Sequence, residues 1–186
     1  MNLNEEKELI EKAKKDPGAF GKIYDENYPK IFGYILKRVA DIEIAKDITS
    51  QTFLKSLKNI WKFKWRNVSF SAWLYRIANN EIANFFRKRK NKLVSLEKVA
   101  EPAFYNNPFT EIAKAEEQLQ RHKDFLKIQG EISRLPLKYQ EVITLRFFEK
   151  KKIREISEIL EKKEGTIKSL IHRALKKLKE ELNATN

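Results

Sequence analysis

Aromatic and cationic side chains alternate along the segment from residue 61 to residue 90. The three tryptophans of the chain all fall between Trp61 and Trp73, among lysines and arginines, and a run of four cations occupies residues 87–90. Cations neutralise phosphates and flat rings stack on exposed bases, so this combination is typical of a surface that holds unpaired nucleotides. Burial in a core is the alternative for any single ring. The set as a whole favours the nucleotide-binding surface, because one helix face cannot bury them all.

The positive charge of the chain is concentrated in two blocks. The net charge is +13, from 39 lysines and arginines against 26 acidic residues. Residues 61–92 carry nine cations and one anion, and residues 135–186 carry thirteen cations and eight anions. Two basic blocks predict two contacts with a polyanion, either nucleic acid or an anionic membrane. We favour nucleic acid and expect a cytoplasmic protein without membrane insertion, since the sequence shows no long apolar segment, signal peptide or lipid-attachment motif.

Residues that could hold a metal or perform catalysis are scarce. The chain has no cysteine, and His172 has no second histidine or carboxylate at ligand spacing. A nuclease or glycosidase would need clustered carboxylates or histidines, which the basic segments lack. We therefore expect no metal, no cofactor and no catalytic residue.

The apolar residues recur at helical spacing almost throughout, and strand signals are nearly absent. This pattern predicts an all-α protein with two small helical domains joined by a flexible linker, the second domain being a helix-turn-helix. The first domain is expected over residues 1–92. Its predicted helices cover 16–39 with an interruption near Tyr28-Pro29, 41–60, and 69–89, the last capped by Ser69 or Ser71.

The expected linker comprises residues 93–130, where the helical period is lost around Pro102 and Pro108 before it returns. A tether of this length lets two domains sit far apart on an extended partner. The second domain is expected over residues 131–186. Its predicted helices run from Pro136 to about residue 148, from 153 to 160 and, after a tight turn, from 165 to 178.

Three polar stripes stand out on the predicted helices. In the helix over 41–60, Leu54 lies in the middle of the polar stripe, which favours contact with a protein partner over a solvated face. In the helix over 69–89, the stripe can stack on bases, hydrogen-bond to their edges and meet phosphates. On the last helix, the polar face is typical of a recognition helix in the DNA major groove, in preference to an ordinary amphipathic surface helix. The three stripes are, in order, Asp47, Gln51, Leu54 and Lys58; Trp73, Arg76, Asn80, Asn84 and Arg87; and Lys168, Ser169, His172, Arg173 and Lys176.

These features together resemble the extracytoplasmic-function (ECF) sigma factors, the two-domain initiation subunits of bacterial RNA polymerase. The resemblance extends from about Ala19 to Leu182. It rests on segments in both domains, in the family's order across a linker. They are Ala19-Phe20 with Ile23-Tyr24, residues 47–53, residues 70–80, Leu135-Pro136 with residues 139–142, Glu155-Ile156, and residues 165–169 with 172–174.

The resemblance implies a function for each stripe. The first would dock on the coiled coil of the polymerase β′ subunit. The second, with the preceding aromatic loop from Phe63 to Phe70, would melt the minus-ten promoter element and capture a flipped base of the non-template strand. The last helix would read the minus-thirty-five element as duplex. The residues implied are Asp47, Gln51, Leu54 and Lys58 for polymerase; Phe63, Lys64, Trp65, Arg66, Phe70, Trp73, Arg76, Asn80, Asn84 and Arg87 for the minus-ten element; and Thr166, Lys168, Ser169, His172, Arg173 and Lys176 for the minus-thirty-five element.

The family resemblance also implies partners. They are core RNA polymerase, through its β′ coiled coil and β flap, promoter DNA, and an anti-sigma factor; catalysis would belong to the polymerase. A polymerase-independent helix-turn-helix regulator is the alternative. A simple regulator has no use for the aromatic loop or the Asp47 stripe, so the N-terminal domain distinguishes the two.

The turn before the last helix departs from the family pattern. Relatives usually carry a glycine, an apolar residue and a serine cap there, where this chain has Glu161-Lys162-Lys163. A residue other than glycine in a left-handed conformation costs on the order of 1 kcal/mol, and an absent cap costs about as much. The sequence therefore predicts a turn that is looser, or that is settled only on DNA. Leu170 stands where many relatives have arginine, which puts one phosphate contact in doubt.

Overall fold

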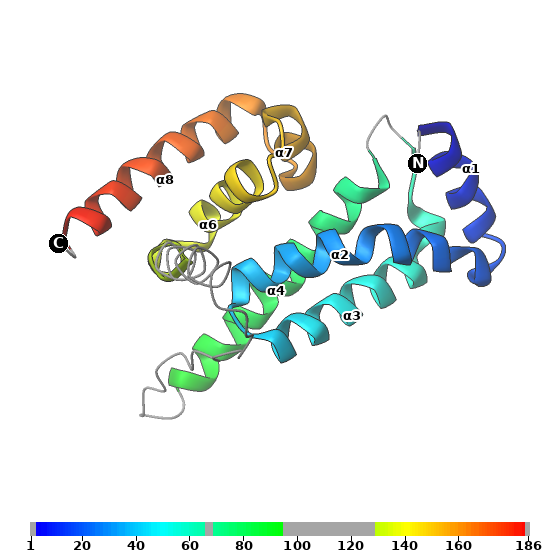
Figure 1. Ribbon diagram of the computed structural model, residues 1–186, viewed down its shortest axis with the longest axis horizontal. Helices are drawn as coiled ribbons and strands as arrows, with labels where there is room; N and C mark the ends of the chain where they lie inside the picture. The colour runs from blue at the N-terminus through cyan, green and yellow to red at the C-terminus, as the bar shows by residue number, and fades with distance from the viewer. Residues whose placement is uncertain (1–2, 66–68, 95–128, 185–186) are drawn as a thin grey trace, which may run out of the picture.

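The structure is a computed structural model that describes residues 3–65, 69–94 and 129–184. The elements in these ranges are all helical and include no strand, which confirms the predicted all-α class (Figure 1). The α-helices are α1 (Leu3–Ala13), α2 (Phe20–Val39), α3 (Ile42–Asn59), α4 (Phe70–Val94), α6 (Leu137–Ile143), α7 (Ile153–Leu160) and α8 (Glu164–Ala184). Shorter elements are the 3-10 turns η1 (Pro17–Ala19) and η2 (Ile60–Lys62), the π-helical turn η3 (Thr144–Phe148), and a helical segment over residues 129–134.

Side-chain caps set the beginnings of the two long helices that carry the candidate site. The carboxylate of Asp41 accepts a hydrogen bond from the Ile44 amide at 3.0 Å, at the start of α3. The hydroxyl of Ser69 accepts one from the Ala72 amide at 3.2 Å, at the start of α4. Such caps satisfy amides that have no partner within the helix. Ser69 is therefore the cap of α4, and Ser71 lies inside the helix.

The expected interruption near Tyr28-Pro29 is wrong, because α2 continues through Pro29. Proline lacks an amide hydrogen, so the helix loses the bond to the Asp25 carbonyl. Asp25 and Pro29 are both exposed, so water can satisfy the Asp25 carbonyl. In the following turn Ile31 and Ile35 are completely buried, and this packing holds the helix together across the proline.

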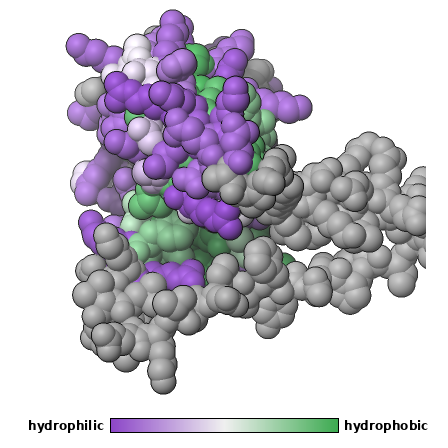
Figure 2. Space-filling model, turned by 90° about the vertical axis from the view of Figure 1, so that its left-hand side faces the viewer, coloured by the Kyte–Doolittle hydropathy of each residue, from purple (hydrophilic) through white to green (hydrophobic). Residues whose placement is uncertain are grey.

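The second helical unit packs directly on the first. The turn η3, which follows α6, contacts α2, and α7 contacts α4, so the buried apolar residues of both units form one continuous core. Seen from the side of the C-terminal helices, hydrophilic residues cover much of the described surface, with hydrophobic residues visible beneath them (Figure 2). Most of the predicted linker, residues 95–128, lies outside the described residues.

A buried polar network lies where the two units meet. The hydroxyl of Tyr34 donates to the side-chain oxygen of Asn79 at 2.6 Å, and the Arg38 guanidinium donates to both, at 3.0 and 3.1 Å. Burial raises the pKa of the Tyr34 phenol to about 12, so it acts as a neutral donor. Burial also raises the pKa of the Glu141 carboxyl on α6, against the opposing effect of the Arg38 charge.

Replacing Glu141 by glutamine should make the stability of the protein less sensitive to pH. A carboxyl whose pKa is raised in the folded state stabilises the fold most below its ordinary pKa of 4.5, and this stabilisation is lost as pH rises through the folded-state pKa. As pH rises from 4.5 through the raised pKa of Glu141 in the folded state, wild type should therefore lose stability relative to Glu141→Gln. Thermal unfolding midpoints from about pH 4 to 8 measure the difference. Glu164→Gln, at an exposed position, is the control, and parallel pH profiles for all three proteins would contradict the expectation.

Candidate nucleic-acid interface

Four of the five residues of the predicted α4 stripe line one pocket. The pocket has a volume of about 680 Å³, within the range that holds drug-sized ligands, so it has room for a nucleotide. Asn80 and Arg87 are exposed, while Trp73 and Asn84 are half-buried. Arg87 also donates a hydrogen bond to the side-chain oxygen of Asn84 at 2.7 Å. The pocket thus combines an aromatic ring, two amides and a cation on one wall.

The opposite wall comes from the end of α3 and from η2. Lys55, Asn59 and Lys62 line it, and the sequence analysis did not assign these residues to the site. Their spacing of four and three residues places them on one helix face, which was the available signal. Two lysines facing Arg87 give the pocket the charge expected of a phosphate-binding surface.

A part-buried ion pair joins the two walls. The Lys55 ammonium lies 2.6 Å from the Glu81 carboxylate, whose side chain is only 8% exposed. The carboxylate is therefore paired rather than free to repel a phosphate. The pair connects α3 to α4, and both of its residues line the pocket.

The aromatic loop supports the pocket from inside the core. Phe63 is 6% exposed and Phe70 is completely buried, which corrects the expectation that these rings face nucleic acid. The two ring centroids lie 5.3 and 5.1 Å from that of Trp73, so the phenylalanines hold the tryptophan in place. Trp65 is half-buried against Phe63, at 6.1 Å. Among the described residues, the rings of Phe63 and Phe70 thus pack against each other and against the first turn of α4.

The remaining two predicted loop residues are both cationic. Lys64 is exposed, whereas Arg66 lies outside the described residues.

The most exposed ring of the segment is Trp61, at 66%. Its indole nitrogen donates to the Lys58 carbonyl at 3.0 Å, and the Lys62 ammonium lies 4.9 Å from its ring. Trp61 therefore stands between the pocket and the stripe on α3. The sequence analysis noted it in the aromatic cluster and did not carry it into the site.

The α3 stripe predicted to contact polymerase is fully on the surface. Asp47, Gln51, Leu54 and Lys58 are all exposed, and Leu54 is 51% exposed. The opposite face of α3 is buried, through Ile48, Thr52 and other residues. The stripe is thus a continuous outer surface with one large apolar side chain, as a docking surface requires.

The helix-turn-helix presents its predicted polar face outward. On α8, Ile167 and Ala174 are completely buried, and the six residues predicted to contact DNA are exposed. These six are Thr166, Lys168, Ser169, His172, Arg173 and Lys176. Leu170 is half-buried against the core, which accounts for an apolar side chain there.

Glu161 does adopt the left-handed conformation that the sequence comparison indicated. Its φ of 52° and ψ of 41° end α7 in the manner usually reserved for glycine. The turn is closed by hydrogen bonds, since the Lys162 amide donates to the Ser157 carbonyl at 3.1 Å. The backbone of Glu161 and this hydrogen bond together define the conformation of the turn.

Arg76 is the one stripe residue that does not line the pocket. Its guanidinium donates to the carbonyls of Glu158 at 2.6 Å and Ile159 at 3.3 Å, at the end of α7. It also pairs with the Glu161 carboxylate at 2.6 Å. In this arrangement the C-terminal unit holds a side chain that was expected to contact promoter DNA.

Within the described ranges, no group of histidine and acidic side chains is arranged to hold a metal ion. Among the same residues, no helix is both long and apolar enough to cross a bilayer.

Two family models match the chain, and both describe parts of sigma factors. Sigma-70 region 2 matches residues 23–92, and Sigma-70, region 4 matches residues 125–178. The chain is 31% identical to the ECF RNA polymerase sigma factor SigW of Bacillus subtilis over 185 residues, covering 98% of both proteins. It is also 31% identical to the ECF RNA polymerase sigma factor BldN of Streptomyces coelicolor, over 92% of this chain and 63% of that protein.

Solved structures share the fold. CnrH in complex with the cytosolic domain of CnrY superposes with a TM-score of 0.70 at 18% identity, covering 97% of this chain and 99% of CnrH. The sigma factor RpoE of Bartonella quintana, in complex with the anti-sigma factor NepR, superposes with a TM-score of 0.64 at 22% identity, covering 90% and 98%. These likenesses show that the two-domain helical fold is shared.

Proposed function

The chain belongs to the ECF sigma factors of RNA polymerase, and on that premise we propose how its surfaces divide the work of initiation. As a sigma factor it joins core RNA polymerase and directs the enzyme to promoters. The N-terminal domain, residues 1–92, docks through the Asp47 stripe and opens the minus-ten element. The C-terminal domain, residues 131–186, reads the minus-thirty-five element through α8. Residues 93–130 connect them.

The observation that best supports this division is the pocket between α3 and α4. It places Trp73 and Asn80 opposite Lys55 and Lys62, so a base can stack and hydrogen-bond while its phosphates meet cations. Extruding a base costs a few kcal/mol, and stacking on a single ring returns roughly 1 to 3 kcal/mol. A single ring with amides beside it is therefore sufficient to hold one flipped base.

The polymerase performs the catalysis, and this chain contributes none. An anti-sigma factor is a partner of this chain as it is of RpoE, and the cytoplasm is the compartment where the chain meets polymerase.

Reconstitution with core polymerase tests the proposal. The chain should co-purify with core enzyme and allow it to open a cognate promoter, found by mapping transcript starts after overexpression. Absence of co-purification would leave the polymerase-independent regulator as the better account. That alternative explains α8 but gives no role to the α3–α4 pocket.

Replacing Arg173 by alanine should weaken the upstream contact in one of two measurable ways. If Arg173 reads a base, affinity for a minus-thirty-five duplex falls by roughly 1 to 3 kcal/mol with relaxed specificity at one position. If it meets a phosphate, the slope of log affinity against log salt falls by about one. Salt titrations of duplex binding separate the two. Lys179→Ala, further along α8, is the control. An unchanged affinity and an unchanged salt slope for Arg173→Ala would exclude the assignment of α8 to the minus-thirty-five element.

A further inference from the structure

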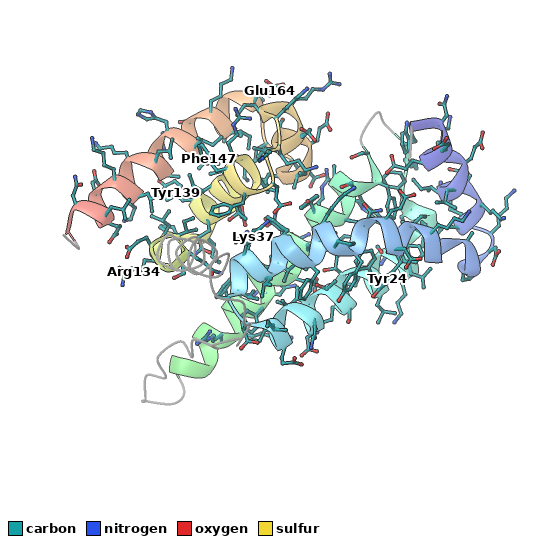
Figure 3. The ribbon with its side chains drawn as sticks, in the orientation of Figure 1. Tyr24, Lys37, Arg134, Tyr139, Phe147 and Glu164 are labelled. Carbon is teal, nitrogen blue, oxygen red and sulfur yellow. The ribbon has the colours of Figure 1, made fainter. Side chains whose placement is uncertain are left out.

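A buried hydrogen-bonded network joins α2 to α4 at the residue next to the pocket. Asn79 of α4 is only 6% exposed, and its side-chain oxygen accepts hydrogen bonds from the Tyr34 hydroxyl at 2.6 Å and the Arg38 guanidinium at 3.1 Å. Both donors lie on α2, which crosses α4 and packs against it (Figure 3). The next residue along α4, Asn80, is exposed and lines the pocket.

The buried side chains around this network are mostly apolar. Ile31 and Ile35 of α2, and Leu74, Ala78 and Ile82 of α4, are completely buried in the same core. Apolar contacts are non-directional, and a core built from them alone loses its unique arrangement before it loses stability. A hydrogen bond requires a particular distance and direction. The network is therefore the part of this packing that can fix the rotation of α4 about its axis.

The network is only partly satisfied, which argues against a purely stabilising role. Within the part of the chain that the structure describes, the Nε of Arg38 and the Nδ2 of Asn79 are buried and donate to no acceptor. A buried donor without a partner destabilises the folded state, and replacing a whole set of buried polar partners by apolar groups of similar shape is often neutral or stabilising. What the network provides beyond stability is a defined geometry.

Holding Asn79 in place also fixes the direction of Asn80. Successive residues of an α-helix are rotated by about 100°, so a helix with Asn79 held toward α2 presents its neighbour to the pocket between α3 and α4. A rotation of α4 by about 20° would move a side-chain atom about 5 Å from the helix axis by roughly 2 Å. A functional site has to be held within about 0.5 Å of its productive geometry. A small loss of register at Asn79 is therefore enough to misplace Asn80.

We propose that Asn79 is a positioning residue for base capture and that it acts through Asn80. Tyr34 and Arg38 hold the Asn79 oxygen, the held side chain fixes the rotation of α4, and this rotation aims the Asn80 amide at the edge of a flipped base. Asn79 does not contact the base itself, because it lies in the core. The effect on promoter opening rests on the proposed function, whereas the effect on α4 does not.

An apolar version of the network separates positioning from stability. The combined variant Tyr34→Phe, Arg38→Met and Asn79→Leu removes the polar atoms of the network and keeps its approximate shape. Its thermal unfolding midpoint should stay at or above that of wild type. Promoter opening should nevertheless fall roughly three- to tenfold with duplex binding unchanged, because Asn80 is no longer aimed. A purely stabilising network would instead lower the unfolding midpoint and promoter opening together.

Two single substitutions test the same point if the combined variant folds poorly. Asn79→Asp keeps an oxygen acceptor for Tyr34 and Arg38, and it should restore opening to the wild-type level. Tyr34→Phe removes one hydroxyl and should lower opening about twofold. The matched control is Thr52→Val, which removes a buried hydroxyl whose hydrogen bond stays within α3, to the Ile48 carbonyl at 2.8 Å. This control should leave opening unchanged.

A double-mutant cycle tests whether the network acts through Asn80. In a chain that already carries Asn80→Ala, the apolar network should reduce opening by less than about a further twofold, because the residue that it positions is gone. If the two reductions multiply in full, the network and Asn80 act separately and the inference fails.

Relaxation-dispersion NMR of the α4 backbone amides observes the positioning without DNA or polymerase. Wild type, Asn79→Asp and Thr52→Val should show no exchange broadening at Asn80 and Asn84. The apolar network should show exchange on the microsecond-to-millisecond timescale at both amides. An α4 that is equally rigid in wild type and in the apolar network would overturn the inference, and so would an apolar network that opens promoters as wild type does.

The two kinds of measurement separate this inference from the proposed function. If the apolar network mobilises α4 and even wild type fails to open a promoter with core polymerase, the positioning of α4 stands and the proposed role of the pocket fails. If wild type and the apolar network open promoters equally and α4 is equally rigid in both, the proposed function stands and the positioning role of Asn79 fails.

Discussion

Asp47→Lys should reduce binding to core RNA polymerase by at least about a hundredfold and abolish promoter-dependent transcription. Asp47 is exposed in the middle of α3, in line with Leu54 and Lys58. A reversed charge at a docking surface places like charges together, which costs several kcal/mol when the partner surface is complementary to the original charge. The fold should be unaffected because the side chain is outside the core. Pull-down with core enzyme and single-round transcription measure the effect.

Glu180→Lys is the matched control for this prediction. It makes the same change of charge at an exposed position on α8, away from α3. It should bind core polymerase as wild type does. If Asp47→Lys retains transcription, the α3 stripe is not the docking surface.

Asn80→Ala should spare the binding of duplex promoter DNA and reduce strand opening about tenfold. Asn80 is exposed on the pocket wall, so its amide can hydrogen-bond to a flipped base. Losing a bidentate base contact costs roughly 1 to 3 kcal/mol, and 1.4 kcal/mol corresponds to a factor of ten. Permanganate reactivity of unpaired thymines in the reconstituted complex measures opening, and filter binding measures duplex affinity.

Asn183→Ala, an exposed asparagine near the end of α8, controls for the substitution itself. Trp73→Ala should also reduce opening, yet its ring packs against Phe63 and Phe70, so that variant also loses aromatic packing. The Asn80 result is therefore the decisive one. Normal permanganate reactivity in Asn80→Ala would remove the pocket from the opening step.

Local chemistry accounts for what could be predicted from the sequence. Asp41 and Ser69 precede apolar periodic segments and cap the helices that follow, as short-range hydrogen-bonding rules require. The fixed rotation per residue of a helix placed Trp73, Asn80 and Arg87 on one face, and the pocket contains all three. The confirmed all-α class follows from the same period.

Long-range packing accounts for what could not be predicted. Phe63 precedes α4 and Phe70 begins it, in a basic, aromatic segment, and their burial depends on the packing of Phe63 against Phe70 and Trp73. Arg76 has the same helical spacing as the pocket residues, yet its partners lie 82 and 83 residues away along the chain. Helical periodicity carries no information about such contacts. Lys55 was missed for a related reason, because only the packing of α3 on α4 brings it opposite the predicted stripe.

The packing of α3 on α4, with the ion pair between Lys55 and Glu81, sets the separation of the pocket walls before any ligand arrives. A preorganised cavity does not have to be assembled at the moment a base enters, so little conformational entropy is lost on capture. Discrimination between bases should then depend on the shape and hydrogen-bonding edge of the base, with similar capture kinetics for all four. The rate of promoter melting by this chain should then depend on the free energy needed to unstack the captured base in each DNA sequence. It should not depend on a rearrangement of α3 and α4.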